Sequence, residues 1–335
     1  MARLRRVSPR SVGWTRRRAG KGFSYRDAGG DALPQESVER IKALAIPPAW
    51  KDVWICPHEN GHIQAVGTDD AGRRQYLYHP DWRTKRDELK FDRVKVAGTR
   101  LAKARERMID DLRAEGMPLA RAAATATRLL DLGYFRIGSD AYTDANGSFG
   151  LTTLERRHVR RQGTDLVFSF VGKSGIEHSI TISDQQVIDS LNLMRKRRGG
   201  STRLLAYKGE ARWADLQATA VNSYIAQLVA EDLTAKDFRT WHATVLAAVA
   251  LAESPEKGDT AASRRRAVKL AVEEVSAYLG NTPTIARKSY VDPRVIEQYE
   301  DGVTIAGTLA KRYRDDSKRQ AAIEKAVARL IDGAD

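Results

Sequence analysis

A chain of 335 residues, 42% of them hydrophobic, is long enough to bury one large core or two ordinary ones, which excludes a disordered tail. Its 57 lysines and arginines outnumber its 43 aspartates and glutamates, giving a net charge of +14, so a polyanion is the first partner to consider. The surplus is uneven, because residues 1–90 hold 18 basic residues against 11 acidic ones. The single cysteine, Cys56, cannot form an internal disulfide, and a reducing, cytoplasmic compartment is expected.

The first 26 residues contain nine basic residues and no acid. Such a segment predicts an arm that binds phosphate, with an organelle transit peptide or a solvated, disordered terminus as alternatives. No run of apolar residues approaches the roughly 18 needed to span a membrane, the longest candidate being Val245–Ala252. No membrane association is therefore expected.

Residues 20–80 have the pattern of short strands and turns that is typical of a small β-rich domain. The apolar runs VWICP and HIQAVG are separated by turn-forming residues at 59–61, and a second turn signal follows at 69–72. The spacing predicts one helix over Gln35–Leu44, which ends before Pro47 and Pro48 because proline lacks a backbone N–H. A meander of strands is expected after this helix.

From about Asp81 the pattern changes to long helical periodicity with dense charge, so we place a domain boundary near Lys90, with domains over 1–90 and 91–335. Short strands are then expected at Leu151–Leu154, His158–Gln162, Asp165–Val171 and Ile176–Ile182. The last two flank Gly172-Lys173-Ser174-Gly175, which predicts a hairpin with Lys173 at its tip. Helical spacing marks 101–116, 118–133, Trp213–Glu231, Thr234–Glu253 and Ala261–Leu279. The predicted class is α+β, with a β-rich N-terminal domain and a larger, mainly helical domain that contains a small sheet.

Four side chains are candidates for chemistry, although each has a structural explanation when taken alone. Arg136 in YFRIGSD and Arg239 in KDFRTW would suit surface or ion-pair positions. Lys173 would suit an exposed turn, and Tyr290 in KSYVDP an amphipathic position with its hydroxyl at the surface.

In order and context, however, these segments resemble the type IB DNA topoisomerases, in their compact poxvirus-like and bacterial form, from about Ile46 to Asp292. The tract IPPAWKDVWICPHENGHIQAVGTDDAGRRQYLYHPDW resembles the family's small clamp domain. The segments FRIGSDAYTDANGSFGLTTL, FSFVGKSG, AKDFRTWHAT and LGNTPTIARKSYVDP follow in the family's order. The resemblance implies the catalytic fold that tyrosine recombinases and type IB topoisomerases share.

The resemblance also implies transesterification on a DNA phosphodiester, without ATP, a metal ion or another cofactor. Tyr290 matches the nucleophile that forms a 3′-phosphotyrosyl link, and Lys173 matches the general acid for the leaving 5′-oxygen. Arg136 and Arg239 match the residues that clamp the phosphate, a role that suits a guanidinium because it stays charged and can donate two parallel hydrogen bonds. Swivelling of the cut strand before religation would relax both positive and negative supercoils.

Asn281 lies nine residues before the tyrosine, where the poxvirus enzymes and most relatives have histidine. Its amide can donate a hydrogen bond to a phosphate oxygen but cannot exchange a proton. The alternative is that Asn281 is only a turn residue after the helix stop at Gly280. No base is assigned to Tyr290, because His242 is better explained as a structural histidine.

Five further positions match DNA contacts of the family: Gln75, Tyr76, Tyr78, Tyr142 and Lys236. The expected partner is double-stranded DNA, bound by a monomer mainly through phosphates, in the cytoplasm and at the nucleoid. Tyr76 and Tyr78 share one face of a strand, which is equally typical of a pair in a core. Ser139 replaces a lysine of the poxvirus form, so a strict target-site preference is not carried over.

Three other functions stay open. A tyrosine recombinase has the same order of Arg, Lys, Arg and Tyr, but usually a histidine where this chain has Lys236. A catalytically silent DNA clamp needs only the charge and the aromatic residues. A metal-dependent nuclease could use Asp110 and Asp111, although this pair lies in a charged helical pattern. The sequence has no GxxxxGK[ST] loop for ATP.

Overall fold

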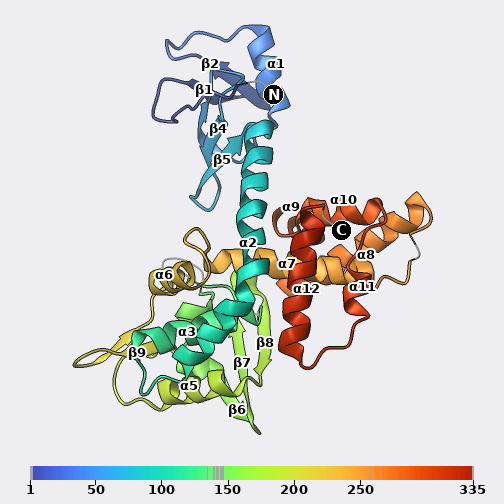
Figure 1. The fold of residues 1–335 in the computed structure, drawn as a ribbon. Coiled ribbons are helices and arrows are strands. Elements are labelled where there is room, and N and C mark those ends of the chain that lie inside the picture. Colours follow the sequence, from blue (N-terminus) through green and yellow to red (C-terminus); the bar gives the residue numbers. More distant parts are fainter. Residues whose placement is uncertain are drawn as a thin grey trace. The chain divides into compact units, whose positions relative to one another are not determined.

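The structure is a computed structural model that describes residues 3–133, 135–138, 140, 143, 147–256 and 258–333 (Figure 1). The chain divides into two compact units, Met1–Lys90 and Phe91–Asp335. The first is rich in strands and the second is mainly helical with small antiparallel sheets, so the predicted α+β class is confirmed. None of the helices in the described ranges is long and apolar enough to cross a membrane.

An antiparallel sheet with the strand order β2-β1-β3-β4-β5 forms the first unit. Its strands are β1 (Trp14–Ala19), β2 (Gly22–Arg26), β3 (Lys51–Ile55), β4 (Ile63–Thr68) and β5 (Arg74–Tyr78). One helix, α1 (Gln35–Ala43), buries Ile41 against Val53, Ile55 and Ala65 of the sheet. The predicted helix and the meander of β3, β4 and β5 are confirmed.

The second half of the basic N-terminal segment is folded, which bears on one of the alternatives considered for it. The Arg16 guanidinium, on β1, donates hydrogen bonds to the carbonyl oxygens of Ile46, Pro47 and Trp50 at 3.2, 3.0 and 2.6 Å. The strand also pairs with β2 and β3. The alternative of a disordered terminus is therefore wrong for residues 14–26. Composition alone suggests that Arg16 is solvated, but carbonyl groups elsewhere in the fold accept its hydrogen bonds.

Cys56 is fully buried beside β3, and burial raises the pKa of its thiol. Gly61 leaves room for the sulfur, because a Cβ built at Gly61 would lie 2.5 Å from Cys56 Sγ. The close approach of the turn to this side chain therefore requires glycine at position 61.

Helices with buried faces make up most of the second unit. The helices are α2 (Pro80–Leu112), which contains the boundary residue Lys90, α3 (Leu119–Asp131), α5 (Gln185–Lys196), α6 (Ala218–Leu228), α7 (Ala235–Ala252), α8 (Ala261–Leu279), α9 (Pro283–Ser289), α10 (Pro293–Glu300), α11 (Ala306–Leu309) and α12 (Asp316–Ile331). Most residues of α7 are buried, and its Trp241 has no exposed surface. It packs against α3, α8, α10 and α12 (Figure 1).

A small antiparallel sheet interrupts the helices, with β7 between β6 and β8. Its strands are β6 (Val159–Gln162), β7 (Asp165–Val171) and β8 (Glu177–Ile182). The turn between β7 and β8 spans Lys173–Gly175, so the predicted hairpin is confirmed. Its tip contains two successive residues of positive φ, Ser174 at 67° and Gly175 at 74°.

Two predicted elements are wrong. Leu151–Leu154 does not form a strand, because the Thr153 N–H donates to the Gly150 carbonyl and closes a short 3-10 turn, while the N–H groups of Leu151 and Thr152 donate to the carbonyls of Arg136 and Ile137. The helix expected from Trp213 begins only at Ala218, because Trp213–Asp215 forms β10 and pairs with β9 (Ala206–Lys208). The amino end of α7 is capped, since the Asp237 carboxylate accepts hydrogen bonds from the Thr234 backbone N–H and hydroxyl.

A buried charge cluster joins α2, α3 and α12. The Arg105 guanidinium donates to both carboxylate oxygens of Asp131 and to both of Glu324, at 2.7 to 2.8 Å. Burial alone would raise the pKa of Asp131, but the charge and hydrogen bonds of Arg105 outweigh burial and lower it to about 2. His242, on α7, is also buried, with Nε2 at 3.8 Å from Asp131 Oδ1, as expected of a structural histidine.

Candidate active site

The carboxyl end of α8 is the frame of the candidate site. Gly280 ends this helix in the left-handed conformation, at φ 60° and ψ 47°, which glycine adopts without strain. Its N–H donates to the Ala277 carbonyl, and the Asn281 N–H donates to the Ser276 carbonyl, the two bonds of a Schellman motif. The Leu279 carbonyl remains free to accept from side chains, at the end of the helix that favours cations.

Two predicted arginines meet at that carbonyl. Arg136 Nη2 lies 3.2 Å from the Leu279 oxygen and Arg239 Nη2 lies 2.6 Å from it. Arg136 Nη2 also donates to the Gly280 carbonyl at 3.2 Å and to Asn281 Oδ1 at 2.9 Å. Three segments that are distant in sequence therefore converge on one helix end.

The segment that carries Arg136 is held by a close backbone crossing. The Arg136 carbonyl accepts from the Leu151 N–H at 2.7 Å. A Cβ built at Gly150 would lie 2.4 Å from Gly138 Cα, so the two backbone segments can approach this closely only because glycine occupies these positions. This crossing fixes the path of the backbone on both sides of Arg136.

Arg239, on α7, is only 6% exposed, and its surroundings disfavour its positive charge. Burial, and then the positive charge of Arg136, lower the pKa of Arg239 to about 10. Its Nε is buried and has no hydrogen-bond partner among the described residues. A bound anion would relieve both conditions, since it offers an acceptor and a compensating charge.

A pocket of about 100 Å³ lies in front of these arginines. It is lined by Arg136, Phe149, Phe170, Gly172, Lys173, His178, Ile180, Arg239, Tyr278 and Leu279. Lys173, on the exposed hairpin turn, thus shares one small cavity with both arginines. Three cations converge there, which suits an anionic ligand of the size of a phosphate.

Tyr290 is the C-terminal capping residue of α9 and is half-buried. It is close to Arg239 but is not one of the residues that line the pocket. The centre of its ring lies 5.9 Å from Arg239 Cζ. The Thr244 hydroxyl, on α7, lies 3.2 Å from the Tyr290 carbonyl oxygen and accepts from the Asp292 N–H at 3.1 Å. One buried side chain of α7 therefore holds the backbone on both sides of Val291.

Asn281 is more than a turn residue, because its Oδ1 accepts from Arg136. Its Nδ2 is buried and has no partner within the described chain. Like Arg239 Nε, this amide is a donor with unmet hydrogen-bonding capacity.

The predicted DNA contacts lie at several places. Tyr76 and Tyr78 stack on one another with ring centres 6.0 Å apart and are 41% and 37% exposed, so the alternative of a core pair is wrong. Gln75 Nε2 donates to Asp69 Oδ2 at 2.8 Å. Lys236 is exposed in the first turn of α7, whereas Tyr142 and Ser139 lie outside the described residues.

Sequence reasoning missed Thr244 and His178. His178, on β8, lines the pocket, and its ring centre lies 5.0 Å from that of Phe170. Thr244 ends the AKDFRTWHAT segment, but nothing in that segment singles it out, and His178 lies outside the segments that carry the resemblance. Only the alternation of β8 could have placed His178 on the same face as Ile180 and Ile182.

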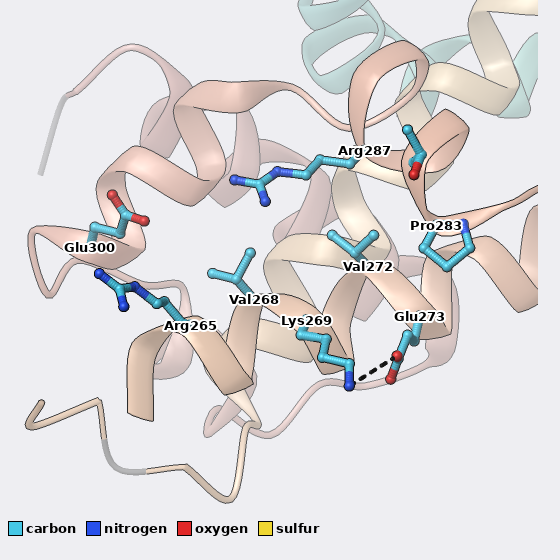
Figure 2. A pocket seen from close by; sticks show the side chains of 9 residues that line it. Arg265, Val268, Lys269, Val272, Glu273, Pro283, Arg287 and Glu300 are labelled. Atoms are coloured by element: carbon cyan, nitrogen blue, oxygen red, sulfur yellow. Dashed lines mark ion pairs between the residues drawn. The ribbon is translucent and has the colours of Figure 1, made fainter. Parts of the chain in front are cut away.

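A second pocket, of about 350 Å³, lies where α8 and α9 meet (Figure 2). Figure 2 shows the valines of α8, Val268 and Val272, between charged side chains, among which Lys269 and Glu273 form an ion pair at 3.8 Å. It contains none of the predicted site residues.

The acidic pair considered for a nuclease has a different environment. The Asp111 carboxylate accepts a hydrogen bond from the Tyr224 hydroxyl at 2.6 Å. Within the described ranges, no three His, Cys, Asp or Glu side chains are grouped so that they could hold a metal ion.

Comparison with known proteins identifies the relatives of this chain. Residues 79–317 match the family "Eukaryotic DNA topoisomerase I, catalytic core", and residues 22–69 match "Bacterial DNA topoisomerase IB, N-terminal domain". The chain is 28% identical to a DNA topoisomerase 1B of Acanthamoeba polyphaga mimivirus over 280 residues, covering 81% of this chain and 82% of the relative. It is 22% identical to DNA topoisomerase 1B of vaccinia virus (strain Copenhagen) over 237 residues, covering 70% and 72%. The resemblance seen in the sequence is confirmed, and the chain belongs to the DNA topoisomerase I family of enzymes, in its compact type IB form.

Proposed function

We propose that this protein relaxes positive and negative DNA supercoils by cutting one strand through a 3′-phosphotyrosyl intermediate, letting the duplex swivel and resealing it. The observation that carries the proposal is the convergence of Arg136, Arg239 and Lys173 on one small pocket beside Tyr290. ATP is not required, because the bond to tyrosine conserves the energy of the broken diester for religation, and Arg136 and Arg239 supply the positive charge that a metal ion would otherwise provide.

In the cleavage step, the Tyr290 oxygen forms a bond to the scissile phosphorus and the bond from phosphorus to the 5′-oxygen breaks. Arg136 and Arg239 stabilise the charge on the non-bridging oxygens. Arg239 Nε and Asn281 Nδ2, which have no partner among the described residues, supply further donors. Lys173 gives a proton to the departing 5′-oxygen. The tyrosine proton passes to solvent, and the reverse sequence reseals the strand.

Double-stranded DNA is the proposed substrate, bound by a monomer. Gln75, Tyr76 and Tyr78 contact it from the N-terminal unit, and Lys236 and Tyr142 from the catalytic unit. The exposure of the stacked tyrosine pair and of Lys236 supports this role. Since phosphate contacts dominate, affinity falls steeply with salt.

The test is relaxation of negatively and of positively supercoiled plasmid in EDTA without ATP, with Tyr290→Phe beside the parent. Relaxation of both signs by the parent alone is the expected result. Equal activity of the two proteins, or relaxation of neither plasmid by the parent, would overturn the proposal. DNA binding retained by the variant shows that only chemistry is lost.

A further inference from the structure

His178 lines the cationic pocket, although no motif marks it. It lines the pocket together with Arg136, Lys173 and Arg239. It is the cross-strand partner of Phe170 in the hairpin, and the two rings are nearly parallel, 23° apart. The hairpin that carries Lys173 therefore also carries an imidazole into the same cavity.

Gly172 makes room for this ring, and Gly280 lies beside it. A Cβ built at Gly172 would lie 2.6 Å from His178 Nε2, and one at Gly280 would lie 3.8 Å from His178 Cε1. Gly172 immediately precedes Lys173, and Gly280 immediately precedes Asn281. The imidazole thus lies between the backbones that carry two proposed catalytic side chains.

Stacking, and not hydrogen bonding, holds the ring. Within the described part of the chain, neither ring nitrogen of His178 makes a hydrogen bond, although each is a donor or an acceptor. The ring is only partly buried, so a nitrogen remains available to a ligand in the pocket.

The charged and titratable residues that line the pocket with His178 are three cations and one tyrosine. Arg136 lies on the segment after α3, Arg239 on α7, Lys173 on the hairpin and Tyr278 on α8. Burial, and then the charges of Arg136 and Arg239, lower the pKa of His178. A phosphate in the pocket offsets those charges, which favours the imidazolium form in the complex with DNA.

We propose that His178 is a further catalytic residue, which donates a hydrogen bond from its ring to a non-bridging oxygen of the scissile phosphate and stabilises the transition state most strongly when protonated. It supplies the titratable donor that the amide of Asn281 cannot provide. The inference rests on the proposed function, because it assigns the pocket to the scissile phosphate.

The test is the rate of covalent adduct formation in a single turnover, measured from about pH 8 to about pH 5.5. The substrate is a duplex with a cleavage site mapped on plasmid DNA by the parent, in which the 5′-hydroxyl fragment is short enough to dissociate. The parent is compared with His178→Gln and with His178→Phe, which keeps a ring to stack on Phe170. The matched control is His158→Gln, because His158 also packs on a phenylalanine, Phe149, but does not line the pocket.

The ratio of the parental rate to that of either His178 variant is expected to rise about tenfold as the pH falls across this range, since only the parent gains an imidazolium. The ratio for His158→Gln stays flat. A flat ratio for both His178 variants, or a parental rate for His178→Phe, overturns the role of His178 while the proposed function stands. Absence of an adduct with the parent overturns the proposed function itself.

Discussion

Arg136 and Arg239 donate hydrogen bonds to the same backbone oxygen, that of Leu279, at 3.2 and 2.6 Å. Two like charges are held together by the negative end of a helix, and no carboxylate of the described residues pairs with either of them. Each arginine uses Nη2 for this bond and has other guanidinium donors that can bind an external anion. The planar, forked guanidinium is what allows one side chain to contact the carbonyl and an anion together.

Replacing either arginine by lysine keeps the charge and removes the fork. For Arg136→Lys and for Arg239→Lys we expect the single-turnover cleavage rate to fall about 100-fold or more, because a transition-state donor is lost. Arg121→Lys is the matched control, since the Arg121 guanidinium also donates to backbone carbonyls, those of Ala114 and Gly116, but outside the pocket. Cleavage by either active-site variant at the parental rate would contradict the phosphate-clamp role.

Thr244→Val tests the attachment of Tyr290 to α7. Loss of the hydroxyl leaves the buried Asp292 N–H without its acceptor, which costs about 1–3 kcal/mol of stability. We expect cleavage to slow about tenfold, because the tyrosine loses its positioning, while DNA affinity is unchanged. Thr125→Val removes a hydroxyl that donates only to the Arg121 carbonyl of its own helix, and it should cleave normally. Equal cleavage by the two variants would argue against a positioning role.

Gly150→Ala tests the backbone crossing beside Arg136. Its Cβ would meet Gly138 Cα at 2.4 Å, so the two segments must separate and carry Arg136 away from Leu279. We expect a lower melting temperature together with slower cleavage. Gly307→Ala, on α11, meets no atom within 4 Å and should leave both quantities unchanged or raise stability slightly. A Gly150→Ala protein with parental melting and cleavage would show that the crossing can relax.

Glu324→Ala tests the buried charge cluster. Arg105 would keep a single carboxylate partner in a buried site, and breaking such a cluster costs about 3–5 kcal/mol of stability. Thermal unfolding should shift down by about 10 °C. The control is Glu256→Ala, which breaks the pair with Arg266, a largely exposed arginine, and should change the melting temperature little. Similar shifts for both variants would contradict the importance of the cluster.

Acid unfolding should reveal Asp131. Its folded pKa of about 2 lies below the ordinary value of 3.8, so its contribution is present above about pH 4 and is lost as the pH falls toward 2. This contribution amounts to about 2 kcal/mol. Denaturant unfolding at a series of pH values should give a flatter acid limb for Asp131→Asn than for the parent. Parallel acid limbs would show that Asp131 titrates normally.

Local signals in the sequence predicted local structure. Alternation on both sides of Gly172 and Gly175 was enough to predict the hairpin and the position of Lys173, and the helix stop at Gly280 follows from the conformational freedom of glycine. The strand β1 was missed because one of its arginines, Arg16, is satisfied by carbonyls 30 to 34 residues away.

The site itself depends on longer connections. Leu279 lies 143 residues from Arg136 and 40 from Arg239, and no periodicity relates these three positions. Family resemblance named the arginines, but the shared carbonyl, the Thr244 bridge and the place of His178 come from tertiary packing. A lone buried threonine, or a histidine on a strand, carries no pattern that distinguishes it from an ordinary core residue.

The buried position of Cys56 has a practical consequence for following the hairpin in solution. It is the only cysteine of the sequence, it is fully enclosed, and burial raises the pKa of its thiol, so little reactive thiolate is present. A cysteine introduced by Ser174→Cys, at the exposed tip, would therefore react selectively with a maleimide dye in the otherwise native chain. Fluorescence from that single label would report how the tip beside Lys173 moves when DNA binds and when the strand is released.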